Sequence, residues 1–151
     1  MSGWPPAPPS QVLYVAEPPA RYLPQPPLVV DCSALAGLLF QEPTQDQARA
    51  RLAGRSLYAP LILQSEICNV ALKKARQGAA VAAAAGLAQW QEFDIELLRI
   101  DVAATFALAQ RYNLSAYDAG YLWLAAELQS PLATFDDKLA KAAQAHLSTL
   151  S

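Results

Sequence analysis

Histidine is almost absent from this chain, which has a single one, His146, near its C-terminal end. Catalysis by a pair of histidines is therefore excluded. A Ser-His-Asp triad would have to use His146, and no sequence around it suggests a nucleophile elbow. We expect His146 to be an ordinary residue of a helix surface, and any hydrolytic chemistry to use carboxylates together with a metal ion.

Cysteine is also scarce, because Cys32 and Cys68 are the only two and form neither a C-x-x-C motif nor a zinc-ligand array. We expect two reduced, buried thiols rather than a disulfide. The most apolar run, GAAVAAAAGLAQW, is too short and too rich in alanine to cross a bilayer, and no secretory signal is visible. These features predict a cytoplasmic protein that makes no contact with a membrane.

Neither sign of charge is in excess, since 13 acidic residues face 11 basic ones and the net charge is −2. Charged residues make up 16% of the chain and hydrophobic residues 54%, which is typical of a globular protein with a well-filled core. Net charge therefore gives no indication of nucleic-acid binding. Any such contact would need a local basic face.

Proline, by contrast, is concentrated at one end, where residues 1–27 hold nine of the twelve prolines. Proline cannot continue a helix or a central strand, so this segment favours an extended, polyproline-like chain. Large apolar side chains such as Trp4 and Tyr14 leave two alternatives open: part of the segment packs on the domain or a partner, or it is a disordered tail. We divide the chain into a proline-rich N-terminal extension, 1–27, and one domain, 28–151.

From residue 28 onward, the hydrophobic pattern alternates between short apolar runs and longer helical runs. The predicted strands cover 28–31, 56–60, 95–100 and 131–135, and the predicted helices cover 33–40, 44–54, 61–77, 79–93, 101–112, 115–129 and the C-terminal tail. Strands that alternate with helices predict an α/β fold, in which a parallel sheet has helices on both faces.

Four carboxylates stand where the predicted strands and helices meet. Asp31 ends the first predicted strand and Asp136 follows the last one, whereas Glu66 and Asp118 lie in the first turns of two helices. Ligands of parallel α/β sheets gather outside the carboxyl ends of the strands. We therefore expect these four side chains to converge at one edge of the sheet.

Three of these acids also have a structural explanation. Asp31 is well placed to cap the helix that follows it, and Glu66 would be favoured by the positive end of its helix dipole. Ser115 and Asp118 form an S-x-x-D capping box. Taken singly, capping explains each residue as well as a functional role does.

The neighbouring aspartates in TFDD require a choice between two roles. Thr134 and Asp137 form a second capping box, T-x-x-D, and this box leaves Asp136 without a structural explanation. We assign Asp136 to the predicted site and Asp137 to the start of the helix.

Clustered carboxylates are suited to metal-assisted hydrolysis of phosphodiesters. Mg²⁺ or Mn²⁺ prefers hard oxygen ligands and keeps several waters, so a few carboxylates can hold it. A bound cation lowers the pKa of a water ligand and offsets charge on the phosphate. Acids crowded together without a cation would repel one another, so the cluster predicts a metal ion.

Polar residues near these acids fit the same chemistry. Glu66, Asn69 and Lys73 share one face of the helix 61–77, where Asn69 could orient a carboxylate or a water and Lys73 could approach a phosphate. With Lys74 and Arg76 they form a local basic surface, although a simply solvated face explains the same pattern. The hydroxyls of Ser33, Ser115 and Thr134 lie beside predicted ligands, where capping and support of the site are both open explanations.

Four segments together resemble the motifs of a known family. VVDCSALAGLLF, SEICNVALKKA, LSAYDAGYLWLA and LATFDDKLAKAA, in this order, resemble PIN-domain ribonucleases, and most of all the VapC-type toxins of bacterial toxin–antitoxin pairs. The resemblance covers residues 28–147. It implies a PIN-like fold with a parallel sheet of four or five strands, Mg²⁺- or Mn²⁺-dependent cleavage of RNA, a cognate antitoxin and a homodimer.

The resemblance also implies a set of site residues. The family's acidic positions match Asp31, Glu66, Asp118 and Asp136. Its small hydroxyl residue two positions after the first aspartate matches Ser33, and its T-x-D pattern matches Thr134 and Asp136. Asn69 matches the asparagine often found three positions after the glutamate. The proline-rich extension departs from the family pattern and leaves the antitoxin contact and the dimer geometry open.

Two other classes of protein are alternatives to a nuclease. One is a receiver-like or phosphatase-like α/β protein that handles phosphoryl groups with carboxylates and a metal ion. VVDCS lacks the D-x-D of an aspartyl-phosphate phosphatase, and a receiver would need paired acids early in the chain. The other is a non-catalytic binding module with a PIN-like fold, in which the acids serve as helix caps.

Overall fold

The computed structural model describes residues 25–150 of the 151-residue chain. Most of the proline-rich extension, and with it the question of whether this segment packs on the domain, lies outside the described residues. The part of it nearest the domain is held by Arg55, whose guanidinium donates hydrogen bonds to the carbonyl oxygens of Pro26 and Pro27.

Strands and helices alternate along the described chain as the sequence predicts. The elements are β1 (Pro27–Val30), α1 (Cys32–Leu39), α2 (Gln45–Leu52), β2 (Ser56–Pro60), α3 (Leu63–Arg76), α4 (Ala80–Glu92), β3 (Ile95–Leu98), α5 (Val102–Tyr112), α6 (Ala116–Glu127), β4 (Leu132–Ala133) and α7 (Asp137–Leu147). The α/β class is therefore confirmed.

The strands form a parallel four-stranded sheet in the order β3-β2-β1-β4. Strand β1 lies between β2 and β4, and its sequence is continuously apolar because Leu28, Val29 and Val30 are all buried. Two strands are shorter than predicted, since β3 ends at Leu98 and β4 pairs with β1 over only two residues. At the end of β4 the chain turns directly into α7, so further pairing is lost.

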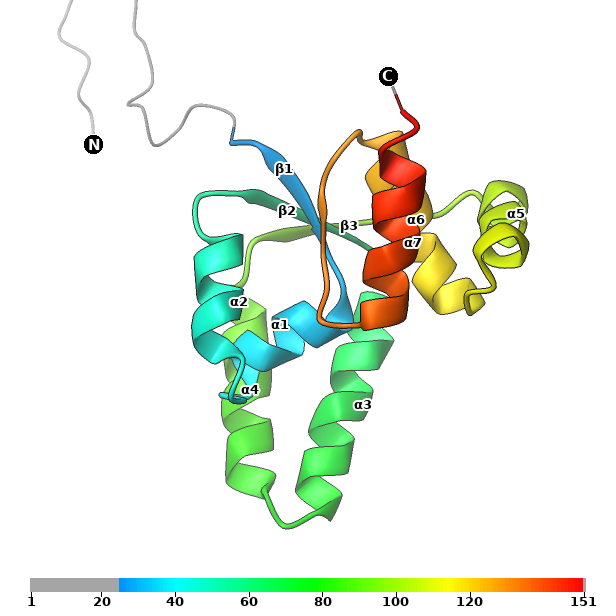
Figure 1. The fold of residues 1–151 in the computed structure, drawn as a ribbon. Helices are drawn as coiled ribbons and strands as arrows, with labels where there is room; N and C mark the ends of the chain where they lie inside the picture. Colours follow the sequence, from blue (N-terminus) through cyan, green and yellow to red (C-terminus); the bar gives the residue numbers. More distant parts are fainter. Residues whose placement is uncertain (1–24, 151) are drawn as a thin grey trace, which may run out of the picture.

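Helices cover both faces of this sheet, as predicted (Figure 1). Helices α1, α2, α3 and α4 pack together on one side, and α5, α6 and α7 on the other. Helix α6 is buried along much of its length, with Leu122, Leu124 and Ala125 in the core. Helices α3 and α4 form a hairpin that extends away from the sheet (Figure 1).

Capping residues set where several helices begin. The side chains of Asp31, Asp101, Ser115 and Asp136 each accept a hydrogen bond from a backbone N–H in the first turn of the following helix. The N-terminal ends of α1, α6 and α7 thereby point to the same edge of the sheet, the one at which the parallel strands end.

Both cysteines are free thiols, as predicted, but the prediction that both are buried is wrong. Cys68 is exposed on α3, and Cys32 is half-buried at the start of α1. Burial, together with the nearby charge of Glu66, raises the pKa of Cys32 to about 12, which leaves the thiol protonated.

His146 differs from a simple surface residue. Its Nδ1 lies 3.0 Å from the hydroxyl oxygen of Tyr112, and the two rings meet edge to face, so His146 joins α7 to α5. None of the helices between residues 25 and 150 is long and apolar enough to span a membrane.

Gly86 allows α4 to approach α1 closely. A Cβ atom at this position would clash with the ring of Phe40 and lie 3.1 Å from the carbonyl oxygen of Leu39. Replacing glycine by alanine inside an exposed helix normally stabilises it by about 1 kcal/mol. At Gly86 we expect the opposite, because this contact is between packed elements.

We predict that Gly86→Ala lowers the free energy of unfolding by about 1–2 kcal/mol, since overpacking exceeds the gain in helix propensity. Urea denaturation followed by circular dichroism measures the change. Ala84→Gly, at an exposed position of the same helix, is the matched control and should lose only the propensity difference. A stabilised Gly86→Ala protein would contradict the close contact between α4 and Phe40.

Candidate active site

Asp31 lies at the carboxyl end of the central strand, where β1 passes into α1. Its side chain is buried, with 5% of the residue exposed. Oδ1 accepts hydrogen bonds from the backbone N–H of Ala34 (3.0 Å) and the hydroxyl of Ser33 (2.7 Å), and Oδ2 accepts one from Thr134. A carboxylate has about four acceptor positions. Asp31 is thus fixed in place and keeps acceptor capacity for a further partner.

Thr134 connects this carboxylate to the end of β4. Its hydroxyl donates to Asp31 and accepts the backbone N–H of Asp136 at 2.9 Å. Ser33 makes a parallel connection, since its hydroxyl donates to Asp31 and accepts the backbone N–H of Phe135 at 2.8 Å. The two hydroxyls therefore bind the turn after β4 to the end of β1.

The prediction that Asp137, rather than Asp136, serves the start of α7 is wrong, whereas the assignment of Asp136 to the site stays a prediction. Asp136 itself caps α7, because its Oδ1 accepts the backbone N–H of Leu139 at 3.1 Å. Asp137 is an exposed residue of the first turn and pairs with Lys141 at 2.9 Å. Thr134 does not form a capping box with Asp137, because its hydroxyl is engaged by Asp31 and by the backbone of Asp136.

Glu66 and Asp118 lie in the first turns of α3 and α6. The capping role of Ser115 is confirmed, since its hydroxyl accepts the backbone N–H of Asp118 at 3.1 Å. Glu66 accepts a hydrogen bond of 2.5 Å from the hydroxyl of Tyr121. Both carboxyl groups are half-buried.

Tyr121 is a residue of this site that the sequence analysis missed. It is 1% exposed, and burial together with the charge of Glu66 raises its pKa, so its hydroxyl stays protonated and donates. Tyr121 stands three positions after Asp118, on the same face of α6. This spacing from Asp118 is the one feature of the sequence that indicates Tyr121. It is a weak indication, because the contact with Glu66 is formed only by the tertiary structure.

Neighbouring carboxylates affect the ionisation of Asp31, Glu66 and Asp118. Burial raises the pKa of Asp31, and the charge of Asp136 raises it further. The hydrogen bonds from Thr134, Ala34 and Ser33 lower it but do not cancel the shift. Burial and the charge of Asp31 likewise raise the pKa values of Glu66 and Asp118. Lys138 acts in the opposite direction on the pKa of Asp118. The described ion pairs involve none of the four acids, so their negative charge is not neutralised within residues 25–150.

This donor set suits a divalent cation in its chemistry. Carboxylate oxygens with uncompensated charge are the ligands that Mg²⁺ and Mn²⁺ prefer. As the side chains lie, however, no three Asp, Glu, His or Cys groups of residues 25–150 are arranged to hold one metal ion. Glu66 is turned to Tyr121 and Asp136 to the first turn of α7, so the acids would have to reorient to share a cation.

The remaining predicted residues lie further along α3. Asn69 and Lys73 are exposed, and no hydrogen bond or ion pair among the described residues joins either of them to the acids. Lys74 is not free for a ligand, because it pairs with Glu42 at 3.5 Å and lies over the ring of Phe40. The basic surface predicted on this helix is therefore smaller than the sequence pattern indicated.

The raised pKa values make a prediction about stability in the absence of divalent cations. A group with a raised native pKa binds more protons in the folded than in the unfolded state, so its ionisation destabilises the fold. Stability should therefore increase as the pH falls from 7 through the raised pKa values of Asp31, Glu66 and Asp118. The gain should level off near the ordinary carboxylate pKa of about 4.

Thermal melts in EDTA between pH 7 and pH 5 measure this effect. Asp118→Asn should flatten the dependence, whereas Asp137→Asn, at an exposed position, should keep it. A melting temperature that falls steadily over the same range would show that the acids are not electrostatically coupled as described.

Comparison with known proteins agrees with this geometry. The family model of the PIN domain matches residues 28–145. Ribonuclease VapC9 of Mycobacterium tuberculosis and VapC ribonuclease Mb0985 of Mycobacterium bovis are each 35% identical over 123 residues, which is 78% of this chain and 92% of the relative. Ribonuclease VapC3 of Pyrobaculum aerophilum is 34% identical over 76% of this chain and 92% of its own.

A solved structure has the same fold. The crystal structure of PAE2754 from Pyrobaculum aerophilum superposes with a TM-score of 0.61 and 22% identity, over 82% of this chain and 96% of that one. The predicted PIN-like architecture is thereby confirmed. The match to the PIN-domain model, the relatives that are 34–35% identical over 92% of their length, and the shared fold lead to one conclusion: the chain belongs to the PIN-domain family of VapC ribonucleases.

Proposed function

We propose that the chain is a metal-dependent endoribonuclease that cleaves RNA phosphodiester bonds with Mg²⁺ or Mn²⁺ held by Asp31, Glu66, Asp118 and Asp136. The observation that carries the proposal is the buried carboxylate of Asp31, which three donors orient near other acids, while none of the ion pairs within residues 25–150 involves these acids. Helix capping alone explains neither this burial nor the mutual repulsion, which costs stability. The names of the curated relatives support the same activity.

Each acid has a distinct part in this proposal. When bound, the cation supplies an acidified water and offsets charge on the phosphate. Asp31 is the rigid ligand, since Ser33 and Thr134 hold both of its oxygens in place. Tyr121 positions Glu66. Asp118 is presented to the cation by the first turn of α6, and Asp136 by the turn before α7.

Substrate binding is assigned to groups around the acids. Lys73 and Asn69 are exposed on the helix that carries Glu66, where they are free to meet RNA phosphates. Ser115 supports the first turn that presents Asp118. The small net charge of −2 makes such local contacts necessary, because the protein as a whole does not attract RNA.

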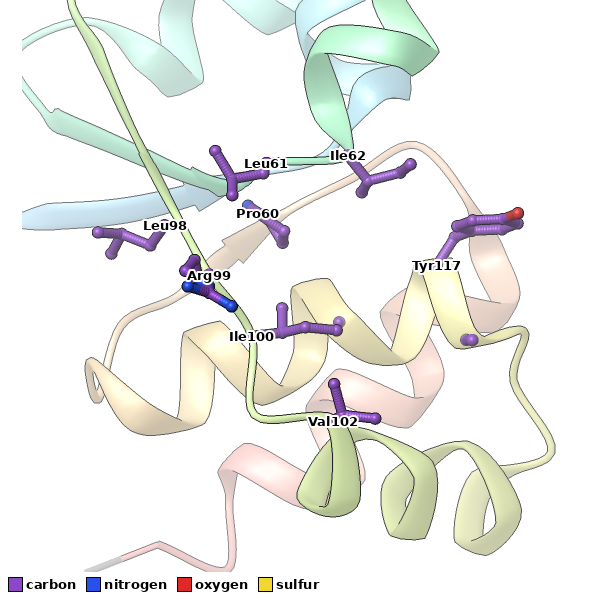
Figure 2. Close-up of a pocket in the computed structure, with 10 residues that line it drawn as sticks. Pro60, Leu61, Ile62, Leu98, Arg99, Ile100, Val102 and Tyr117 are labelled. Atoms are coloured by element: carbon purple, nitrogen blue, oxygen red, sulfur yellow. The ribbon is translucent and has the colours of Figure 1, made fainter.

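We also propose a homodimer, supported by an apolar face beside the acids. Leu61, Val102, Phe106 and Tyr117 are between 47% and 76% exposed. Leu61, Val102 and Tyr117 border an apolar cavity of about 360 Å³ between the ends of β2 and β3 and helices α5 and α6 (Figure 2). Exposed apolar surface of this kind is typical of protein contacts. A molar mass of twice 16.2 kDa in light scattering would establish the homodimer.

The cleavage proposal predicts the behaviour of four variants. Asp31→Asn, Asp118→Asn and Asp136→Asn should each reduce Mg²⁺- or Mn²⁺-dependent cleavage of RNA by more than about 100-fold. Removing a hydrogen-bond partner of a metal ligand typically reduces activity roughly 10–100-fold, and removing the ligand itself should reduce it further. Asp136→Asn should keep α7 intact, because asparagine caps helices as well as aspartate does. Gel analysis of labelled RNA with purified proteins measures the rates.

Asp137→Asn is the matched control, because it changes a neighbouring exposed carboxylate and should leave cleavage unchanged. Equal losses from Asp136→Asn and Asp137→Asn would contradict the assignment of Asp136. Cleavage that survives EDTA would contradict the metal dependence. The absence of cleavage, together with no rise in melting temperature on adding Mn²⁺, would favour a non-catalytic binding module.

The toxin function predicts a growth phenotype. Expression of the chain alone should arrest a bacterial host, and co-expression of the reading frame adjacent to its gene, which would encode the antitoxin, should restore growth. Asp118→Asn should be harmless in the same test. Arrest that persists in this variant would mean that toxicity does not depend on RNA cleavage.

A further inference from the structure

Phe135 is held in a fixed position next to the acids by its own backbone. Its N–H donates to the hydroxyl of Ser33 at 2.8 Å, and that hydroxyl donates in turn to Asp31 at 2.7 Å. The residue stands between Thr134 and Asp136 in the turn that leads into α7. The backbone of Phe135 is therefore linked to the carboxylate of Asp31 through a single hydroxyl.

One side of the Phe135 ring is covered and the rest is open. A Cβ atom at Gly37 of α1 would lie 3.7 Å from its Cε2 atom, so the ring packs over the glycine. The residue is nevertheless 40% exposed. A single exposed aromatic residue is common on protein surfaces and needs no explanation by itself. What lies beside the ring is more informative.

A small cavity of about 140 Å³ opens next to Phe135 and is lined by residues of α1, α2 and the end of β4. Its walls include Phe135, Thr134, Gln47 and Arg51. The two polar side chains stand four positions apart on α2 and so share one face. The volume is well below the roughly 300–1,000 Å³ of drug-sized ligands. The cavity therefore suits a small flat group that can also form hydrogen bonds.

The charge of this cavity complements a nucleic-acid backbone. Among the ion pairs of residues 25–150, Arg49 pairs with Asp46, but Arg51 has no acidic partner. Arg55, further along, is engaged with the carbonyl oxygens of Pro26 and Pro27. Arg51 thus offers a guanidinium for a phosphate in a cavity that is also lined by Thr134, the hydrogen-bond donor to Asp31.

We propose that this cavity is a subsite for one unpaired base of the RNA, immediately beside the cleaved bond. Phe135 stacks on the base, Gln47 hydrogen-bonds to its edge, and Arg51 contacts the adjoining phosphate. The proposal rests on the ribonuclease function above. It specifies single-stranded RNA, because both faces of a paired base are covered by its neighbours in a duplex.

The test uses an unstructured oligoribonucleotide of mixed sequence whose cut site is first mapped with the wild-type protein. Base–aromatic stacking is typically worth about tenfold in affinity. Phe135→Leu should therefore raise KM by about tenfold, with kcat changed little. Phe135→Trp should restore KM. A melting temperature of Phe135→Leu equal to that of the wild type excludes a folding defect. Restoration of KM in Phe135→Trp excludes a merely structural role.

A second set of substrates identifies the base. Replacing the nucleotides on either side of the cut, one at a time, by abasic residues should weaken wild-type cleavage about tenfold at one position. The same replacement should cause no further loss in Phe135→Leu, because the stacking contact is already absent. If the abasic replacement reduced cleavage by Phe135→Leu by the same factor as cleavage by the wild type, Phe135 would not contact that base, and the proposal would be overturned.

Arg51→Gln and Arg49→Gln form a matched pair on α2. Arg51→Gln should raise KM and weaken the salt dependence of binding, whereas Arg49→Gln, two positions away and paired with Asp46, should not. Wild-type cleavage with an unchanged KM in Phe135→Leu would overturn the subsite alone. Weakened antitoxin binding with unchanged RNA cleavage would assign the cavity to a protein partner instead, and no cleavage by the wild type would refute the ribonuclease function itself.

Discussion

The site depends on one buried carboxylate. Asp31 ends the central strand, caps α1 and accepts the hydroxyl of Thr134, so one side chain joins β1, α1 and β4. A buried charge is costly unless hydrogen bonds compensate it. Three donors do so here, and their directions also set the orientation of the carboxylate. The same contacts that make the burial of Asp31 tolerable therefore prepare it as a ligand.

The other acids follow from the way parallel strands and helices are joined. Each strand of this sheet ends at one edge, and each helix that follows begins there with its N–H groups exposed. Acids at these positions are stabilised as caps or by the helix dipole, so a negative cluster can form without unfolding the domain. Burial and mutual repulsion still raise the pKa values of Asp31, Glu66 and Asp118. A divalent cation would relieve that repulsion.

Much of the fold was predictable because local patterns decide it. The apolar run of β1, the alanine-rich α4 and the capping serine of α6 each carry their own signal. The predictions failed where two local explanations competed. T-x-x-D suggested that Asp137 caps α7, but Thr134 donates its hydroxyl to Asp31, 103 positions away in sequence, and Asp136 becomes the cap. No local pattern contains that partner. The same holds for Tyr121 of α6 and Glu66 of α3, which lie 55 positions apart in sequence and meet only in the tertiary structure.

The sequence by itself determined the α/β class, the order of the elements and the four acids at the ends of strands and helices, because hydrophobic period and capping act over a few residues. Tertiary structure alone decided which hydroxyl serves which carboxylate, that Cys68 is exposed, and that Phe135 lies over Gly37 beside Gln47 and Arg51. These contacts join residues that are far apart in the chain. Their partners are chosen by the packing of whole elements, and no run of neighbouring residues records that choice.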